Sequence, residues 1–305
     1  MEVVNMKIGF IGLGIMGKPM AKHLINTGFD TYLFDLNKDA VNELVELGGI
    51  ACNSNREMVE MCDVIITMLP TGKHVEQVLF ADDGIVKNAK SNTLIVDMSS
   101  VSLEESKSFA SRLKKLGIHY IDAPVSGGEP MAIKGSLAIM AGGEEEQFNR
   151  VLPLFEAMGD KIVHVGTNGA GTVAKLANQI IVSINLTALS EACVFASKSG
   201  IDLNKLYEAI SGGLAGSAVM EAKMPLIIDR NFEPGGRIEI NFKDLANVQS
   251  SANAIGLPLP VTQLVKEIFS SEIANGYAKK DHSFIIDFFE RMGNHRIPKG
   301  GKEIV

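Results

Sequence analysis

The sequence predicts an α/β protein in which a doubly wound, mostly parallel sheet is followed by an all-helical domain. In the first half, apolar runs rich in β-branched and aromatic residues alternate with helix-length amphipathic stretches. The runs lack a regular polar alternation, which indicates strands buried on both faces. After Gly166 no strand-like run of comparable strength follows. The length of 305 residues suits about two such domains.

Seven apolar runs are expected to form the strands of the sheet. They are Ile8–Ile11, Thr31–Phe34, Val64–Met68, Leu94–Val96, His119–Ile121, Leu137–Met140 and Ile162–Val165. Helical stretches between them include Lys18–Asn26, Ala40–Leu47 and Leu103–Leu116. A strand–helix–strand order of this kind favours parallel neighbours in the sheet.

The second half begins with a helical pattern from Gly171 to Ser197, about 40 Å long at the rise of an α-helix. Because this helix is almost uncharged, a second subunit covering part of it would explain its composition, and we expect a homo-oligomer, a dimer or a tetramer. The later helices are expected at Leu203–Ser211, Ala215–Met224, Asn241–Ala254, Thr262–Asn275 and His282–Met292. The expected domains are residues 1–167 and 168–297, with a flexible tail over 298–305.

Composition excludes several classes of function. A net charge of −7 argues against general affinity for nucleic acid or an anionic membrane. Cys52, Cys62 and Cys193 lack CxxC spacing and indicate free thiols in a reducing compartment. No signal-peptide pattern is present, and polar residues interrupt the most apolar stretch, so we expect a cytoplasmic protein. The six histidines show no metal-ligand spacing, and we expect no metal.

The first strand runs directly into a glycine-rich turn, Gly12-Leu13-Gly14-Ile15-Met16-Gly17. A GxGxxG pattern alone is weak evidence in a chain with 30 glycines. Here it follows a strand, opens a helix and is trailed by a second strand ending at Asp35, which is the context of a dinucleotide-binding fingerprint. Gly12 would make the turn, Gly14 would admit the pyrophosphate and Gly17 would allow close helix packing, with the phosphates at the helix N-terminus.

Asp35 discriminates between cofactors. Its carboxylate would accept hydrogen bonds from the adenosine ribose and repel a 2′-phosphate. No arginine follows at Leu36 or Asn37, and Lys38 is the only nearby cation. The sequence therefore favours NAD (NADH) over NADP. The alternative is that Asp35 merely caps the next helix.

Two further loops follow strand ends, one containing Leu69 and Pro70 and the other containing Ser100. Ligands of doubly wound sheets lie outside the carboxyl ends of the strands, so these residues are expected to line the cofactor crevice. Each loop, taken alone, is equally well explained as a turn.

Ser126, Gly127 and Gly128 follow another predicted strand. A serine hydroxyl and the backbone N–H groups of two glycines suit a bound anion, so a small molecule carrying a carboxylate is the expected ligand. A structural β-turn is the alternative.

Lys175 is the only charged side chain between Ile162 and Ser190 when histidine is counted as neutral. Burial favours the neutral amine and would suit Lys175 to exchange a proton near neutral pH. Asn178 and Gln179 follow at i+3 and i+4, on the same helical face. Alternatively, Lys175 extends to the surface near the helix end.

Six segments together resemble the β-hydroxyacid dehydrogenase family. They occur in family order over nearly the whole chain and are GFIGLGIMGKPMAKHL, TMLP, VDMSS, DAPVSGGEPMAIKGSLAIMAGG, HVGTNGAGTVAKLANQ and FKDL. The resemblance implies a Rossmann domain, a helical domain and a substrate bound between them. It also implies NAD-dependent hydride transfer from the alcohol carbon of a short β-hydroxy acid, or to the aldehyde carbon of its oxidised form.

By position, the resemblance identifies Lys175 as the catalytic lysine and Ser126–Gly128 as the substrate loop. It places Ser100 near nicotinamide and substrate, and Lys243 over the cofactor with Asp244 beside it. Many family members have asparagine four residues after the catalytic lysine, where this chain has Gln179 preceded by Asn178. Which of these two amides touches the substrate stays open.

Within the family, the segments KLANQ, GGLAGS and DRNF favour the subgroup that reduces tartronate semialdehyde (2-hydroxy-3-oxopropionate) to D-glycerate. Oxidation of 3-hydroxyisobutyrate or 2-(hydroxymethyl)glutarate and reduction of glyoxylate or succinic semialdehyde are alternatives. A dinucleotide-binding scaffold without catalytic activity is an alternative of a different class.

Overall fold

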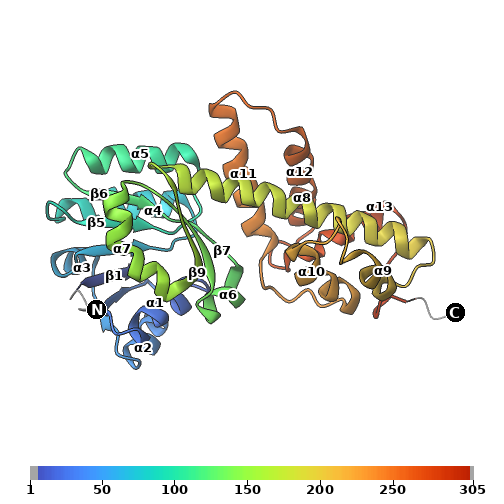
Figure 1. Ribbon diagram of the computed structural model, residues 1–305, viewed down its shortest axis with the longest axis horizontal. Helices are drawn as coiled ribbons and strands as arrows, with labels where there is room; N and C mark the ends of the chain where they lie inside the picture. Colours follow the sequence, from blue (N-terminus) through green and yellow to red (C-terminus); the bar gives the residue numbers. More distant parts are fainter. Residues whose placement is uncertain (1–5, 303–305) are drawn as a thin grey trace. The chain divides into compact units, whose positions relative to one another are not determined.

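The computed structural model describes residues 6–302 (Figure 1). Residues 1–5, the start of the expected first domain, and 303–305, the end of the expected tail, lie outside this range. The chain divides into two compact units, the first ending at Lys175 and the second beginning at Leu176.

The N-terminal unit contains one sheet with helices on both faces. Within the described residues the sheet has nine strands in the order β3-β2-β1-β4-β5-β6-β8-β7, with β9 paired to β8. The strands are β1 Lys7–Ile11, β2 Asp30–Phe34, β3 Ile50–Ala51, β4 Val64–Thr67, β5 Leu94–Asp97, β6 His119–Asp122, β7 Val125–Ser126, β8 Leu137–Gly142 and β9 Gly159–Gly166. All seven expected strands are present; β3 and β7 have only two residues each, too few to show a pattern in the sequence.

The sheet is parallel from β3 to β6, as expected, and then reverses. Strand β8 runs antiparallel to both β6 and β7, and β9 is parallel to β8. Strands β6 and β7, separated only by Ala123 and Pro124, run in the same direction, so the chain reverses between β7 and β8, across residues 127–136.

The helices of this unit form two layers. They are α1 Gly17–Asn26, α2 Lys38–Val45, α3 Asn55–Met61, α4 Gly72–Phe80, α5 Leu103–Lys114, α6 Gly128–Lys134 and α7 Glu145–Met158, with a 3₁₀ turn η1 at Ile85–Lys87. On β4, Val64 and Ile66 pack into a core with α1, α2 and α7, whereas Ile65 packs into a second core with α3, α4 and α5. Strands buried on both faces explain the continuous apolar runs of the sequence.

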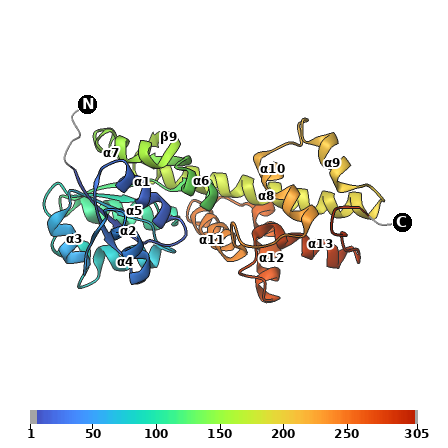
Figure 2. The same ribbon diagram turned by 90° about the horizontal axis from the view of Figure 1, so that it is seen from below.

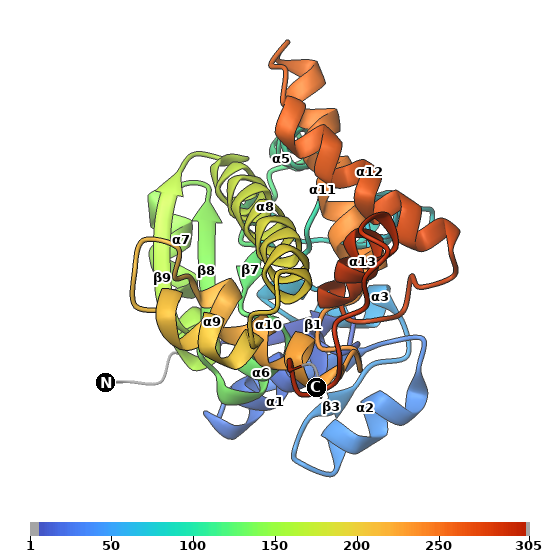
Figure 3. The ribbon, with the colours of Figure 1, turned by 90° about the vertical axis from the view of Figure 1, so that its right-hand side faces the viewer.

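The described part of the C-terminal unit is helical. Helix α8, Ala170–Lys198, starts in the first unit and continues into the second. It is followed by α9 Leu203–Ile210, α10 Ala218–Asp229, α11 Ile238–Ala254, α12 Pro260–Ala274, the 3₁₀ turn η2 His282–Ile285 and α13 Ile286–Met292. Helices α11 and α12 lie side by side (Figure 2; Figure 3).

Helix α8 is long and apolar enough, by length and composition, to cross a membrane. Its side chains nevertheless take part in two cores of the C-terminal unit. Leu186 packs in one core with residues of α11 and α12, and Cys193 and Val194 pack in another with residues of α10. This burial is typical of the core helix of a folded domain.

The three cysteines are buried free thiols that form no disulfide bond. Burial raises the pKa of Cys52 to about 11 and the pKa values of Cys62 and Cys193 to about 12. At neutral pH these side chains are protonated thiols, which are poor nucleophiles.

The described part of the expected tail is hydrogen-bonded to the rest of the unit. The Gly301 carbonyl accepts a hydrogen bond from Leu203 N at 2.9 Å, and Gly300 N donates to the Ile228 carbonyl at 2.8 Å. These contacts attach residues near 300 to the start of α9 and to the end of α10.

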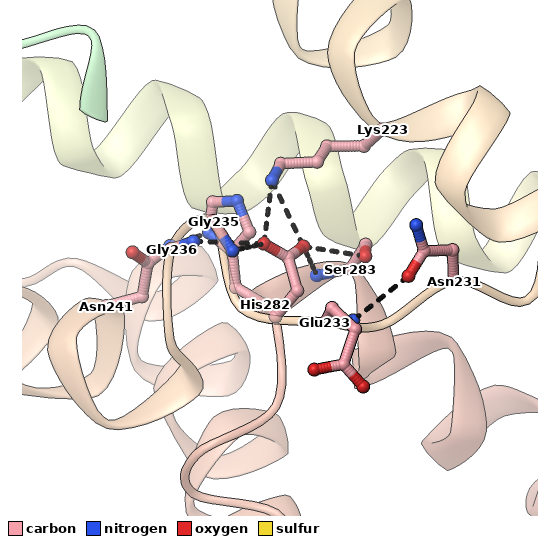
Figure 4. Close-up of polar contacts among 9 residues, drawn as sticks. Lys223, Asn231, Glu233, Gly235, Gly236, Asn241, His282 and Ser283 are labelled. Carbon is pink, nitrogen blue, oxygen red and sulfur yellow. Dashed lines mark hydrogen bonds and ion pairs between the residues drawn. The ribbon is translucent and has the colours of Figure 1, made fainter. Parts of the chain in front are cut away.

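A buried carboxylate, Asp281, holds three segments of the C-terminal unit together. Lys223 Nζ lies 3.0 Å from each of its oxygens, and further donors come from Gly235 N, Gly236 N, and the N–H and hydroxyl of Ser283 (Figure 4). Burial alone would raise the pKa of Asp281, but the charge of His282 when it is protonated, the charge of Lys223 and the Ser283 hydrogen bonds outweigh burial and lower that pKa. The ion pair therefore stays charged inside the unit.

His282 is buried next to this ion pair. Its Nδ1 lies 2.6 Å from Asn241 Nδ2, an amide nitrogen that can only donate, so the ring nitrogen accepts and the imidazole is neutral. Burial, assisted by the charge of Lys223, lowers the pKa of His282 to about 4.

Replacing His282 should flatten the acid dependence of stability. An unfolded histidine gains its proton near pH 6.5, whereas folded His282 gains one only near pH 4. The free energy of unfolding should therefore lose about 3 kcal/mol from this residue as the pH falls between these values. Urea unfolding from pH 7 to pH 4 should show a smaller loss for His282→Asn, which cannot titrate. The variant His74→Asn, at an exposed histidine, should behave like the wild type. An equal loss of unfolding free energy in the wild type and in both variants would contradict the role assigned to His282.

Candidate functional site

The glycine-rich loop between β1 and α1 has different surroundings at each glycine. Gly12 has φ +98°, and a Cβ there would lie 2.3 Å from the Met68 carbonyl oxygen. A Cβ on Gly17 would lie 1.9 Å from the Gly12 carbonyl oxygen, whereas a Cβ on Gly14 would meet no atom within 4 Å. A side chain at Gly12 or Gly17 would therefore collide with the backbone, and both glycines are needed for an unstrained turn. Gly14 faces open space, as a pyrophosphate-binding loop needs.

Asp35 follows β2 and binds the glycine-rich loop. Its Oδ2 accepts a hydrogen bond from Leu13 N at 2.6 Å, and its Oδ1 accepts one from Asn37 N at 2.7 Å. The N-cap of α2 is Asn37, whose side chain accepts from Asp39 N. The alternative interpretation of Asp35 as a helix cap is therefore wrong.

The loops after β4 and β5 are joined by buried hydrogen bonds. Asp97 Oδ1 accepts from the Thr67 hydroxyl at 2.9 Å and from Ser99 N at 3.0 Å. The Ser99 hydroxyl oxygen accepts from Leu69 N at 2.9 Å. These bonds bring the Leu69–Pro70 turn close to the segment that carries the half-buried Ser100. Asp97 and Ser99 were not predicted as functional residues, although a carboxylate at a strand end was the available signal.

The loop from Ser126 to Gly128 connects β7 to α6. Gly127 and Gly128 have φ values of +136° and +64°, and a Cβ on Gly127 would lie 2.6 Å from Met131 Cβ. Only glycine fits both positions without strain. Ser126 is half-buried and both glycines are exposed, so the loop presents its backbone at the surface of the unit.

The start of α8, the helix that carries Lys175, is held by Asp122 at the end of β6. Asp122 Oδ1 accepts from Gly169 N at 2.7 Å, and Oδ2 accepts from Thr172 N at 2.8 Å and from the Thr172 hydroxyl at 3.2 Å. Burial raises the pKa of Asp122 to about 6 despite these hydrogen bonds. Lys175 is half-buried one helical turn after Thr172. Asp122 opens a motif used for the family resemblance but was not predicted as a site residue.

In the C-terminal unit, α8 and α11 share a chain of polar contacts. Gln179 is 6% exposed, and its Nε2 donates to Asp244 Oδ2 at 2.6 Å. Asn178 Nδ2 donates to Gln179 Oε1 at 3.0 Å, and Lys243 Nζ lies 3.2 Å from Asp244 Oδ1. The structure thus brings together the predicted site residues Asn178, Gln179 and Lys243 with Asp244, the neighbour of Lys243.

Within residues 6–302, no group of three or more His, Cys, Asp or Glu side chains is arranged to hold a metal ion.

Two family models match nearly the whole chain. The model for the NAD binding domain of 6-phosphogluconate dehydrogenase matches residues 7–166. The model for the NAD-binding domain of NADP-dependent 3-hydroxyisobutyrate dehydrogenase matches residues 169–289. The chain belongs to the β-hydroxyacid dehydrogenase family. As a family member it is an NAD(P)-dependent oxidoreductase with a Rossmann domain, and the family match does not select between the two cofactors.

Individual relatives are similar over nearly the whole chain. The 2-hydroxy-3-oxopropionate reductase of Escherichia coli (strain K12) is 44% identical, with 96% of this chain and 100% of that protein covered. The 2-(hydroxymethyl)glutarate dehydrogenase of Eubacterium barkeri is 38% identical, with 94% and 96% covered. The structure of Mycobacterium tuberculosis 3-hydroxyisobutyrate dehydrogenase with L-serine has a TM-score of 0.86 and 31% identity, covering 93% of this chain and 98% of that one.

Substitutions at Gly14 and Gly17 should separate cofactor binding from folding. Gly14→Val places a side chain in open space where the cofactor would approach, so NADH binding should weaken at least about tenfold with little change in melting temperature. Gly17→Ala should lower the melting temperature, because its Cβ would overlap the Gly12 carbonyl. NADH fluorescence titration and thermal unfolding measure the two effects. Wild-type NADH affinity in Gly14→Val would contradict this placement of the cofactor.

Proposed function

We propose that this β-hydroxyacid dehydrogenase reduces tartronate semialdehyde (2-hydroxy-3-oxopropionate) to D-glycerate with NADH. The observation that carries the proposal is the 44% identity, over its whole length, to the E. coli 2-hydroxy-3-oxopropionate reductase. The resemblance of the segments KLANQ, GGLAGS and DRNF to that subgroup also supports the proposal. We expect the enzyme in the cytoplasm, with a small carboxylate-bearing aldehyde or alcohol as its only substrate class.

The residues of the N-terminal unit fit a dinucleotide. Gly14 leaves open space beside the backbone, and the N-terminus of α1 follows directly, where N–H groups suit a pyrophosphate. The nicotinamide cofactor supplies the hydride when it is bound. Lys175 donates a proton to the aldehyde oxygen, on which negative charge develops, and accepts that proton in the reverse direction.

Ser126, Gly127 and Gly128 hold the substrate carboxylate in the proposed mechanism. The serine hydroxyl and the backbone N–H groups of the loop are donors for an anion. Fixing the carboxylate orients the aldehyde carbon for hydride transfer. The step then becomes effectively unimolecular, because the reacting groups are already held in position. Ser100 would lie beside the nicotinamide and the substrate.

Asn178 is the amide that we expect to meet the substrate. Gln179 is buried and donates to Asp244, so its amide nitrogen already serves to join α8 to α11. Asn178 is less buried and lies three residues after Lys175 on the same helix. Lys243, paired with Asp244, is expected to close over the cofactor.

NADH is the proposed cofactor because of Asp35. Both carboxylate oxygens accept backbone hydrogen bonds, which fixes the negative charge at the end of β2, where a 2′-phosphate would meet repulsion. The nearest cation in sequence, Lys38, has its Nζ 5.1 Å from the centre of the Phe34 ring.

A homo-oligomer, dimeric or tetrameric, is also proposed. Ile181 and Phe195 on α8 are 61% and 75% exposed, and large apolar side chains at such exposure suit contact with a second subunit.

Replacement of Lys175 tests the chemical role directly. Lys175→Ala should lower kcat by about 10²–10⁴-fold, the usual contribution of a general acid, while NADH affinity stays within about twofold. Lys205→Ala, on the exposed surface of α9, serves as the matched control and should keep full activity. Near-normal turnover in Lys175→Ala would remove this amine from the mechanism.

A substrate panel tests the specificity. Of the compounds tested, tartronate semialdehyde should give the fastest oxidation of NADH, followed by nicotinamide absorbance. Reduction of the same substrate should be slower when NADPH replaces NADH. The panel includes glyoxylate, succinic semialdehyde, and 3-hydroxyisobutyrate and 2-(hydroxymethyl)glutarate in the oxidative direction. If any of these compounds has a higher kcat/KM than tartronate semialdehyde, the proposed substrate is wrong. NADH binding without turnover of any compound would favour a scaffold.

A further inference from the structure

We propose that Asp122 is a positioning residue, which holds the first turn of α8 and through it sets the Lys175 amine relative to the Ser126–Gly128 loop. The proposal rests on the proposed function, in which Lys175 transfers the proton and the loop holds the substrate. All of these residues lie in the N-terminal unit.

The hydrogen bonds of Asp122 satisfy the start of α8. The first N–H groups of a helix have no partner within the helix, and the buried start of α8 therefore needs outside acceptors. Asp122, itself 1% exposed, provides both oxygens to Gly169 and Thr172, which are 47 and 50 residues away in sequence. A residue on the sheet thus serves as the cap of a helix, in place of a local capping side chain.

The backbone of the first turn of α8 packs directly against the backbone of the sheet. A Cβ on Gly171 would lie 2.2 Å from the Met140 carbonyl oxygen and 2.5 Å from the Asp122 carbonyl oxygen. A Cβ on Gly142 would lie 2.7 Å from Gly171 N and 2.9 Å from Asp122 Oδ1. The helix therefore lies directly on the ends of β6 and β8 without intervening side chains, and the carboxylate bonds fix its rotation.

The same strands hold the substrate loop. Asp122 pairs with Gly142 of β8, Pro124 O accepts from Met140 N at 3.1 Å, and Ser126 pairs with Ala138. Strand β8 therefore contacts both the start of α8 and the segment leading to Ser126. Lys175 is three residues from Thr172, and Ser126 is four residues from Asp122, so the amine and the hydroxyl share one short, hydrogen-bonded framework.

The test compares Asp122→Asn with two other variants. Asparagine replaces one acceptor oxygen by an NH₂ group, which must face the N–H of Gly169 or of Thr172, so that two donors meet without an acceptor. Thr172→Val removes only the hydroxyl donor. Asp202→Asn is the matched control, because Asp202 caps α9 through Asn204 N at 2.9 Å and has no part in the proposed site.

Two measurements are made on each full-length variant. Amide hydrogen exchange of residues 168–175, without ligand, reports the first turn of α8; steady-state kinetics and NADH titration report kcat, KM and cofactor affinity. For Asp122→Asn we expect exchange faster by about tenfold or more. We also expect kcat lower by about 10²-fold, with KM and NADH affinity within about threefold, because a displaced proton donor slows the chemical step and leaves binding in place.

Several outcomes decide the proposal. Unchanged exchange in Asp122→Asn, or faster exchange with wild-type kcat, would overturn it, as would an equal loss of kcat in Asp202→Asn. If Asp122→Asn fails to fold, Thr172→Val should still lower kcat by about threefold to tenfold, and Thr172→Ser should restore it; no loss in Thr172→Val would then overturn the proposal. A wild type inactive on every semialdehyde would contradict the proposed function, whereas the exchange data would still confirm or overturn the role of Asp122 in holding α8.

Discussion

The hydrogen bonds from the start of α8 to the carboxylate of Asp122 are the contact on which the candidate site depends. They join the end of β6 to the helix that carries Lys175. Glycines at positions 142 and 171 let the helix lie directly on the strands, and the carboxylate satisfies N–H groups that would otherwise be buried without partners. The sheet thereby holds the first turn of α8 in the N-terminal unit.

The same physical device recurs along the edge of the sheet. Asp35, Asp97 and Asp122 each stand at or just after the carboxyl end of a strand, and each accepts a backbone N–H from a loop at that edge. Carboxylates with several N–H donors hold loops more firmly than neutral acceptors do. An α/β sheet binds its ligands at this edge, so the rigidity is placed where a cofactor and a substrate need it.

The sequence predicted the parts of the molecule that show a local pattern. Seven strands, the long helix α8 and the packing roles of Gly12 and Gly17 follow from apolar runs, periodicity and spacing within a few residues. The two-residue strands are too short to show such a pattern, and no local pattern reports that β8 runs antiparallel to β6. The bonds of Asp122 to α8 and of Gln179 to Asp244 join residues 47 to 65 positions apart, and no pattern in one sequence reports which distant donor a carboxylate meets.

In the proposed reaction the Lys175 amine delivers a proton to the aldehyde oxygen of the substrate while the Ser126–Gly128 loop holds the substrate carboxylate. A crystal structure of the enzyme with NADH and tartronate, a stable analogue of the semialdehyde, tests it most directly. We expect Lys175 Nζ at about 3 Å from an oxygen of the carboxylate that takes the place of the aldehyde, and the other carboxylate of the analogue hydrogen-bonded to the loop. A Lys175 amine in bulk solvent, remote from both the analogue and the nicotinamide, would contradict the account.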